Sequence, residues 1–176
     1  MDNKEIIGGI GTYAHFAYGF VRQARPKIIL EIGLGESGWG ADAILKALDE
    51  NKQEGFQEDC QYYCIDKFPT KISIDILNKY NHLATLLVGD SGDPSLYKLP
   101  SVADIVFIDG DHSFNHCVKD TINVLMNNQL SIDGVLVFHD IWMCAVRQAI
   151  KKLADEFNLN ILHLKTINVC LATFRI

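Results

Sequence analysis

The chain alternates short apolar runs with longer segments in which apolar residues recur every three or four positions. A short apolar run that ends at glycine or at an acid predicts a buried strand, whereas the longer spacing predicts an amphipathic helix. We therefore expect strands at 28–32, 61–65, 84–88, 104–108 and 135–138. Helices are expected at 41–48, 72–80, 114–126 and 143–157, with a polar linker at 49–59 and a turn at Asp133 and Gly134.

Both ends of the chain add elements to this repeat. Residues 6–23 have apolar side chains at helical spacing and predict an N-terminal helix, in which core burial is the preferred interpretation of Tyr13. Two β-rich segments, 160–164 and 168–174, are joined by so little chain that they predict an antiparallel hairpin. Together these elements predict an α/β fold, a doubly wound, seven-stranded sheet with helices on both faces and a reversed C-terminal strand.

The first predicted strand ends in a glycine-rich turn. Gly33, Gly35 and Gly38 stand in G-x-G-x-x-G order before a helix, an arrangement that lets a backbone approach a ligand and points free N–H groups at it. The motif alone is also found in turns that bind nothing. Glu31 interrupts the apolar end of the strand, where an unpaired carboxylate would be costly. We therefore predict a cofactor site made by these glycines and Glu31.

Polar residues also follow the second and third strands. Asp66 ends the second strand, where a carboxylate can accept both hydroxyls of a ribose, and we interpret it as the ribose ligand. Asp90 and Ser91 follow the third strand. They are predicted either to lie beside a cofactor purine or to cap the helical turn ahead of Pro94.

The fourth and fifth strands end in the most densely ionisable segments of the chain. Asp109, Asp111 and His112 follow the fourth strand, and His139 and Asp140 follow the fifth. The carboxyl ends of parallel strands share one sheet edge, so these groups should lie close to the acids described above. Because like charges at one edge repel, we predict that a cationic cofactor or a divalent metal ion binds there.

Composition limits the class of protein. The 176 residues are 48% hydrophobic, which suits one domain spanning 1–176, with a helical segment at 1–26 and the core at 27–176. A net charge of −6 without any basic cluster argues against nucleic-acid binding. The absence of a long apolar run argues against membrane insertion and a secretory signal, so a cytoplasmic protein is expected. Five scattered cysteines predict reduced thiols.

Several segments resemble the class I S-adenosylmethionine-dependent methyltransferases, which have a Rossmann-like fold. EIGLGESG resembles their first motif, YCIDKF their ribose-binding acid and GDS their adenine-side turn, and the terminal hairpin resembles their reversed seventh strand. FIDGDHS and GVLVFHD are similar to a bacterial O-methyltransferase group, methyltransferase family 24, which includes relatives of sugar and macrolide O-methyltransferases. The resemblance implies S-adenosylmethionine as the cofactor.

The same resemblance implies catalytic roles for the acidic edge. Asp109 and Asp140 would hold Mg²⁺, with Asp109 also beside the cofactor, and Asp111 would act as general base. Hard oxygen ligands of this kind suit Mg²⁺. The chain departs from the family at Ile141, where metal-dependent relatives carry another acid or Asn. His112 and His139 are therefore alternative sources of an imidazole base or ligand, and we take His112 as the second catalytic candidate.

The acceptor is predicted to be a hydroxyl group of a small molecule. The chain lacks a large insertion, so part of the substrate pocket is expected from the N-terminal segment or from a second subunit of a homodimer. An NAD(P)-dependent oxidoreductase would share the glycine turn and ribose acid, but no Tyr-x-x-x-Lys pair follows the fourth strand. An amino-methyltransferase of nucleic acids would carry Asn/Asp-Pro-Pro-Tyr there. A non-catalytic cofactor-binding module is the remaining alternative.

Overall fold

A seven-stranded sheet forms the centre of the molecule. The computed structural model describes residues 10–174. The strand order is β3-β2-β1-β4-β5-β7-β6; β1 to β5 are parallel, and β7 runs antiparallel to both of its neighbours. The strands are β1 (Ile28–Ile32), β2 (Gln61–Asp66), β3 (Ala84–Val88), β4 (Ala103–Ile108), β5 (Leu130–Phe138), β6 (Leu159–Leu164) and β7 (Val169–Phe174). The predicted α/β fold with a reversed last strand is confirmed.

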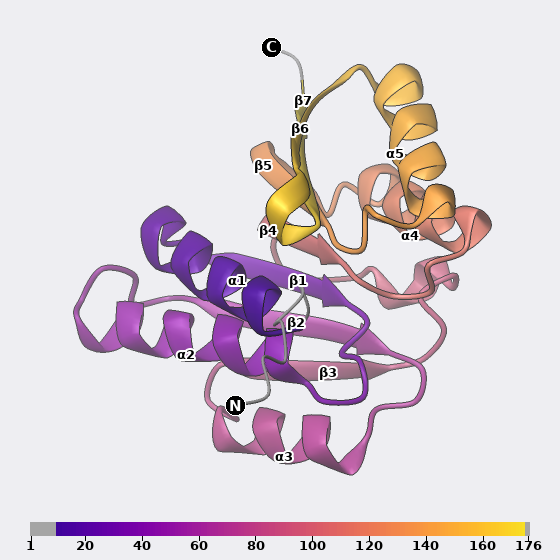
Figure 1. Cartoon of the computed structure of the whole chain (residues 1–176). Helices are drawn as coiled ribbons and strands as arrows, with labels where there is room; N and C mark the ends of the chain where they lie inside the picture. Colours follow the sequence, from indigo (N-terminus) through magenta and orange to yellow (C-terminus); the bar gives the residue numbers. More distant parts are fainter. Residues whose placement is uncertain (1–9, 175–176) are drawn as a thin grey trace, which may run out of the picture.

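Helices cover both faces of this sheet, as predicted (Figure 1). The first face carries α1 (Ile10–Ala24), α2 (Trp39–Gln53) and α3 (Lys71–Lys79). The second face carries α4 (Phe114–Met126) and α5 (Cys144–Phe157). Short 3-10 turns, η1 (Pro94–Leu96) and η2 (Lys165–Ile167), complete the described elements, and η2 joins the strands of the terminal hairpin.

The alternation of side chains along each strand decides which helices they contact. In β1, Leu30 packs with α4 and α5, whereas Ile29 packs with α1 and α2. The same alternation places Phe107 of β4 and Val137 of β5 on the face of α1 and α2. Asp109 and His139, the next odd positions after Phe107 and Val137, continue this alternation just beyond the strands, and the Tyr13 ring of α1 lies against both Phe107 and His139.

Two boundaries differ from the sequence predictions. The helix expected at 41–48 extends to Gln53, because the polar residues predicted as a linker occupy its solvent-facing side while Asn51 is buried. The turn expected at Asp133 and Gly134 is wrong, since both residues lie inside β5, where its pairing with β4 shifts register at a bulge. The first residues of the predicted N-terminal helix, 6–9, lie outside the described residues.

The carboxyl ends of β1 and β4 form the point where the sheet order reverses. Strand β1 lies between β2 and β4, so successive crossovers leave it in opposite directions. The ladder continues just past the strands, because the Gly33 N–H donates to the Ile65 carbonyl and the Asp109 N–H donates to the Ile32 carbonyl, both at 2.9 Å. Ligands of doubly wound sheets bind at such a point. Within residues 10–174, none of the helices is long and apolar enough to cross a membrane.

Candidate functional site

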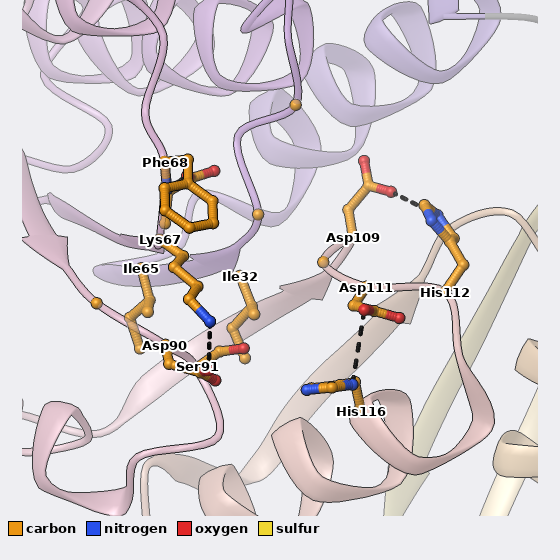
Figure 2. A pocket seen from close by; sticks show the side chains of 15 residues that line it. Ile32, Ile65, Lys67, Phe68, Asp90, Ser91, Asp109, Asp111, His112 and His116 are labelled. Carbon is orange, nitrogen blue, oxygen red and sulfur yellow. Dashed lines mark hydrogen bonds and ion pairs between the residues drawn. The ribbon is translucent and has the colours of Figure 1, made fainter.

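A cavity of about 460 Å³ lies beyond the carboxyl ends of β1 to β4; we call it the first cavity (Figure 2). It is large enough to hold most of a nucleoside-sized ligand. Eight of the residues predicted from the sequence line it: Gly33, Gly35, Asp66, Asp90, Ser91, Asp109, Asp111 and His112. Lys67, Phe68 and His116 line it as well, and the sequence analysis had not selected them.

The three glycines of the turn have different roles. Gly33 has φ 86°, and a Cβ there would lie 2.3 Å from the Asp109 carbonyl oxygen, so this glycine lets two loops of the protein touch. Gly35 has φ 63° and open space around its Cα, and it lines the first cavity. Gly38 caps α2 in the left-handed conformation, and a Cβ there would lie 2.8 Å from Ile76. Gly38 is therefore a packing glycine that lines neither cavity of the site.

Asp66 is held in place by the backbone. Its Oδ2 accepts from the Leu34 N–H at 2.8 Å, and its Oδ1 accepts from the Phe68 N–H at 2.7 Å. Each carboxylate oxygen has a further lone pair that can accept a hydrogen bond from a ligand. The carboxylate is therefore oriented before a ligand arrives, in the cavity where a ribose acid was expected.

Asp90 and Ser91 belong to the wall of the cavity and not to a helix cap. Asp90 accepts from Lys67 Nζ at 2.9 Å and from the Gly92 N–H at 2.8 Å, and the lysine contact lowers its pKa. The cap of η1 is Asp93, whose side chain accepts from the Ser95 N–H at 2.9 Å. Of the two interpretations left open by the sequence, the capping one is wrong.

A second cavity of about 350 Å³ adjoins the first. Gly35, Asp109 and His112 line both cavities, so these residues form the boundary between them. The other residues around the second cavity include Tyr13, Glu31, Trp39, Gly40, His139 and Asp140. This arrangement places a space for a second molecule directly beside the space for a nucleoside-sized ligand.

Four side chains form a compact cluster at that boundary: Asp109, His112, His139 and Asp140. One ligand atom from each lies within 4.8 Å of the others. His139 Nδ1 lies 2.9 Å from Asp109 Oδ1, and His112 Nε2 lies 2.9 Å from Asp140 Oδ2. The cluster forms because Ile108 and Phe138 are paired in adjacent strands, so that the residues after them emerge side by side. We call it the Asp–His cluster.

Opposite charges perturb the pKa values within the Asp–His cluster. Asp109, with a further contribution from Asp140, raises the pKa of His112 to about 10. His112 in turn lowers the pKa of Asp140 to about 2. The cluster thus stabilises positive charge strongly, which the sequence analysis anticipated from the number of acids at this edge.

Glu31 is buried beside the second cavity and does not line the first. It accepts a hydrogen bond from the Tyr62 hydroxyl, and burial raises its pKa to about 8. A Cβ on Gly40 would lie 3.1 Å from Glu31 Oε1 and from the Tyr13 ring, so Gly40 leaves room for both side chains. Glu31 therefore borders the second cavity, with a protein partner that the sequence did not reveal.

Asp111 points away from the Asp–His cluster. It is 58% exposed, its Oδ1 accepts from the Ser113 N–H at 2.7 Å, and its Oδ2 lies 3.6 Å from His116 Nδ1. The bond from Ser113 lowers the pKa of Asp111. Figure 2 shows the two directions, with Asp109 beside His112 and Asp111 beside His116. Asp111 therefore borders only the first cavity.

One buried acid behind the first cavity had no signal in the sequence. Asp120 of α4 is fully buried, and its two carboxylate oxygens find no hydrogen-bond partner within the described part of the chain. A Cβ on Gly110 would lie 3.3 Å from Asp120 Oδ2, so the carboxylate sits just under the cavity wall. Burial raises its pKa to about 6, and an interaction with the Ser91 side chain opposes part of that rise.

Tyr13 and Trp39 line the second cavity, and the sequence did not indicate a site role for either residue. Tyr13 is buried as predicted, yet it also stacks on His139, with ring centroids 4.0 Å apart. Trp39 opens α2 and is 54% exposed at the cavity. These contacts join residues that are far apart in sequence, and neither residue carries a local motif. Only the exposure of a tryptophan at the start of an amphipathic helix could have drawn attention to this position.

Comparisons with solved structures agree with this fold. PaMTH1, a methyltransferase from Podospora anserina in a structure with bound SAH, superposes with a TM-score of 0.74 at 17% identity, covering 93% of this chain and 78% of that one. The O-methyltransferase TomG from Streptomyces achromogenes, in complex with SAM, gives a TM-score of 0.68 at 18% identity, covering 92% and 78%. The methyltransferase MycE, from the mycinamycin biosynthetic pathway and solved with Mg and SAH, gives 0.61 at 17% identity, covering 90% and 48%.

Sequence comparison identifies the family. No curated protein sequence matches the chain. The model of a methyltransferase domain, the family 24 group indicated by the sequence motifs, matches residues 30–141. This match begins in β1 and ends just beyond β5, so it contains both the glycine turn and the Asp–His cluster. Because it spans more than half of the chain, the protein belongs to this methyltransferase family.

Proposed function

We propose that the protein transfers a methyl group from S-adenosylmethionine to a hydroxyl group of a small molecule. The observation that carries this proposal is the pair of adjoining cavities that share Gly35, Asp109 and His112. A methyl transfer needs a donor and an acceptor aligned at close range, and two spaces that meet at an ionisable boundary suit that requirement. Similar structures, the O-methyltransferase TomG in complex with SAM among them, support the donor and the acceptor class.

The donor is proposed to occupy the first cavity. Asp66 would accept from the ribose hydroxyls through the lone pairs that Leu34 and Phe68 leave free. Asp90 and Ser91 would lie beside the adenine, and the backbone of Gly33 and Gly35 would border the methionine portion. Glu31, on the side of the second cavity, would accept from the amino group of that portion. Gly38 is proposed to act only through the shape of the turn.

The acceptor is proposed to occupy the second cavity, with its hydroxyl at the Asp–His cluster. Attack on a sulfonium methyl neutralises charge, so the protein mainly aligns the reactants and helps the hydroxyl to lose its proton. Of the two catalytic candidates, His112 borders both cavities, whereas Asp111 is turned toward Ser113 and His116. We therefore assign the activation of the acceptor hydroxyl to the neutral form of His112, which the raised pKa of this ring makes the minor form at neutral pH, and keep Asp111 as the alternative.

The Mg²⁺ ion expected from the sequence suits this site poorly. Asp109 and Asp140 approach each other as predicted, but two imidazole rings share the same space. Mg²⁺ prefers a shell of oxygen ligands with several waters, and imidazole nitrogen is a less suitable donor for it. Buried Ile141 supplies no further oxygen from its side chain. No step of the proposed reaction therefore depends on Mg²⁺.

Two other functions use some of the same residues. An NAD(P)-dependent oxidoreductase would use Asp66 for a ribose in the same way, but the acids of the Asp–His cluster would not assist hydride transfer. A non-catalytic cofactor-binding module would keep the first cavity and have no use for the second. The cytoplasmic location, the homodimer and the single domain expected from the sequence stay predictions.

A thermal-shift and turnover experiment separates these functions. Purified protein is screened with S-adenosylmethionine, S-adenosylhomocysteine and NAD, each with and without Mg²⁺. We expect the two sulfur cofactors to raise the melting temperature and NAD to leave it unchanged. Protein with S-adenosylmethionine is then given a panel of phenols, catechols and sugars while S-adenosylhomocysteine release is recorded. Stabilisation by NAD alone contradicts the proposal, and cofactor binding without turnover on any acceptor favours the non-catalytic module.

A further inference from the structure

We propose that the Asp–His cluster binds a divalent transition-metal ion, of the class of Mn²⁺, Fe²⁺, Co²⁺, Ni²⁺ or Zn²⁺, in preference to Mg²⁺. The ligands would be one oxygen each from Asp109 and Asp140 and one ring nitrogen each from His112 and His139. The site follows from the positions of these four atoms, and its ligand set differs from the pair of carboxylates that the sequence indicated.

The distances between the four atoms match those around a bound ion. The carboxylate–imidazole separations are 2.9, 2.9, 3.5 and 3.7 Å. Neighbouring ligands bonded to an ion at about 2.1 Å lie about 3.0 Å apart in an octahedron and about 3.4 Å apart in a tetrahedron. The carboxylate–imidazole pairs are therefore already about as close as neighbouring ligands of a bound ion, and all four atoms lie within 4.8 Å of one another.

His112 provides an independent indication of a ligand. Its Nε2 is buried and, despite lying 2.9 Å from Asp140 Oδ2, makes no hydrogen bond of acceptable geometry to any described residue. A buried ring nitrogen without such a partner is costly for the folded protein. An ion between the carboxylates and this nitrogen would supply the missing interaction.

The surroundings of the cluster orient the other ligands. Asp140 Oδ1 accepts from Trp142 Nε1 at 2.9 Å and from Asn168 Nδ2 at 2.7 Å, which leaves Oδ2 for the cluster. The backbone of Asp140 is left-handed, with φ 52°, a conformation that a non-glycine residue adopts at a cost. The ring of His139 is fixed by stacking on Tyr13. Contacts of this kind fix the orientation of the side chains that bind a metal ion.

The identity of the donors selects the class of ion. Two imidazole nitrogens with two carboxylate oxygens suit the borderline ions of the first transition row, whereas Mg²⁺ takes oxygen ligands. The chain lacks an oxygen ligand at Ile141, and the two histidines supply nitrogen ligands instead. Because His112 Nε2 bonded to an ion could not also accept a proton, the ion would lower the pKa of the acceptor hydroxyl in place of that base; this consequence rests on the proposed function, whereas the ion site itself does not.

Metal titrations of the full-length protein test the inference. Protein treated with chelator and then desalted is titrated with Co²⁺, followed by visible absorption and calorimetry, and separately with Mn²⁺ and with Mg²⁺. We expect one Co²⁺ per chain with absorption bands of a nitrogen and oxygen shell, and an affinity for Co²⁺ at least about 100-fold above that for Mg²⁺. Equal affinities for Co²⁺ and Mg²⁺, or no Co²⁺ binding, would overturn the inference.

Variants locate the bound ion. His112→Gln and His139→Gln should each weaken Co²⁺ binding by at least about 10-fold, with unchanged circular dichroism as evidence of folding. His82→Gln is the matched control, because His82 Nε2 makes an equally short 2.9 Å contact with Asp49 outside the cluster. Cys144→Ser tests the exposed thiol as a competing site. Unchanged Co²⁺ binding in both cluster variants, or its loss in either control, would overturn the assignment.

The same samples separate this inference from the proposed function. S-adenosylhomocysteine binding is measured on each of them by calorimetry. Cofactor binding without Co²⁺ binding overturns the metal site alone. Co²⁺ binding at the cluster without cofactor binding overturns the proposed function and leaves the metal site supported.

Discussion

The two cavities differ in how far the protein satisfies its own polar groups. In the first cavity, Asp66 accepts from two backbone N–H groups and Asp90 from Lys67 and a backbone N–H. The Tyr13 hydroxyl beside the second cavity and His112 Nε2 at the boundary of the two cavities are buried, and neither atom makes a hydrogen bond of acceptable geometry among residues 10–174. The first cavity is therefore prepared for a ligand in advance, whereas the second has groups whose partners must come from a bound molecule or ion.

This difference agrees with separate tasks for the two cavities, in which the first binds the donor and the second activates the acceptor. A cavity whose acceptors are fixed by backbone contacts loses little conformational freedom when its ligand binds. An unpaired buried polar atom costs about 1 to 3 kcal/mol, which a ligand can recover on binding. Variants that disturb only one cavity should accordingly have separable effects on cofactor affinity and on turnover.

The largest expected effect is on turnover, from the boundary between the cavities. His112→Gln should lower methyl transfer by about 10²-fold or more, because hydroxyl activation is lost. The affinity for S-adenosylhomocysteine, measured by calorimetry, should change by less than about 2-fold, because the ribose and adenine contacts lie elsewhere. His82→Gln is the control and should retain full turnover. A loss of about 10²-fold in Asp111→Asn, with the turnover of His112→Gln unchanged, would transfer the role to Asp111.

Asp120 differs from the other polar groups of the first cavity, because it lies behind the cavity wall without a hydrogen bond of acceptable geometry to any described residue. Its pKa rises from 3.8 to about 6 on burial, so the folded state binds this proton more tightly than the unfolded state. The contribution of protonated Asp120 to the free energy of unfolding is therefore fully present below about pH 4. About 3 kcal/mol of it is lost as the pH rises through about 6.

Chemical denaturation of Asp120→Asn measures this loss. The free energy of unfolding of the variant, relative to the unmodified protein, should increase by about 3 kcal/mol between pH 4 and pH 8. The exposed Asp155 gives a matched variant, Asp155→Asn. A difference between variant and unmodified protein that stays constant with pH would show that Asp120 has a partner, such as a buried water.

Removal of the proposed ribose acid should affect cofactor binding. Asp66→Ala should cost about 1.5 to 3 kcal/mol of S-adenosylhomocysteine binding, because the ribose hydroxyls lose a charged acceptor. The turn at Leu34 also loses the bond that orients it. Asp66→Asn, which keeps one acceptor oxygen, should lose less. Unchanged calorimetric affinity in Asp66→Ala would exclude this residue from the site.

The smallest expected effect concerns the Tyr13 hydroxyl. Because this buried group lacks a described partner, Tyr13→Phe should leave the free energy of unfolding within about 0.5 kcal/mol or raise it slightly. The stacking on His139 would be retained. Urea denaturation measures the change, and a loss of more than about 1 kcal/mol would reveal a partner and remove this part of the contrast between the cavities.

The fold and the first cavity could be predicted because their signals are local. Strands and helices follow from apolar spacing, and Asp66 and Asp90 follow directly from strand ends. The extra length of α2 could not be predicted, because its last turns have polar residues on the solvent-facing side. The bulge in β5 could not be predicted, because it depends on how β5 pairs with β4. In the same way, the packing role of Gly38 depends on Ile76 of α3, which no local motif indicates.

The second cavity was less predictable because distant segments build it. The sequence selected the acids and histidines after β4 and β5, yet the direction of each side chain decides its role. Asp109 turns toward the Asp–His cluster and Asp111 turns toward His116, although only one residue separates them. The stacking of Tyr13 on His139 requires α1 to pack on the sheet face that carries Phe107, and a single sequence does not show that packing.

Nuclear magnetic resonance tests the central claim most directly, since a chain of 19.7 kDa suits amide-resolved spectra. The ¹⁵N-labelled protein is titrated with S-adenosylhomocysteine and the perturbed amides are mapped. We predict the largest shifts at Gly33, Gly35, Phe68 and Ser91 around the first cavity, with smaller shifts at Trp39 and Gly40 around the second. Shifts confined to the second cavity, or shifts with NAD and none with S-adenosylhomocysteine, would contradict the account.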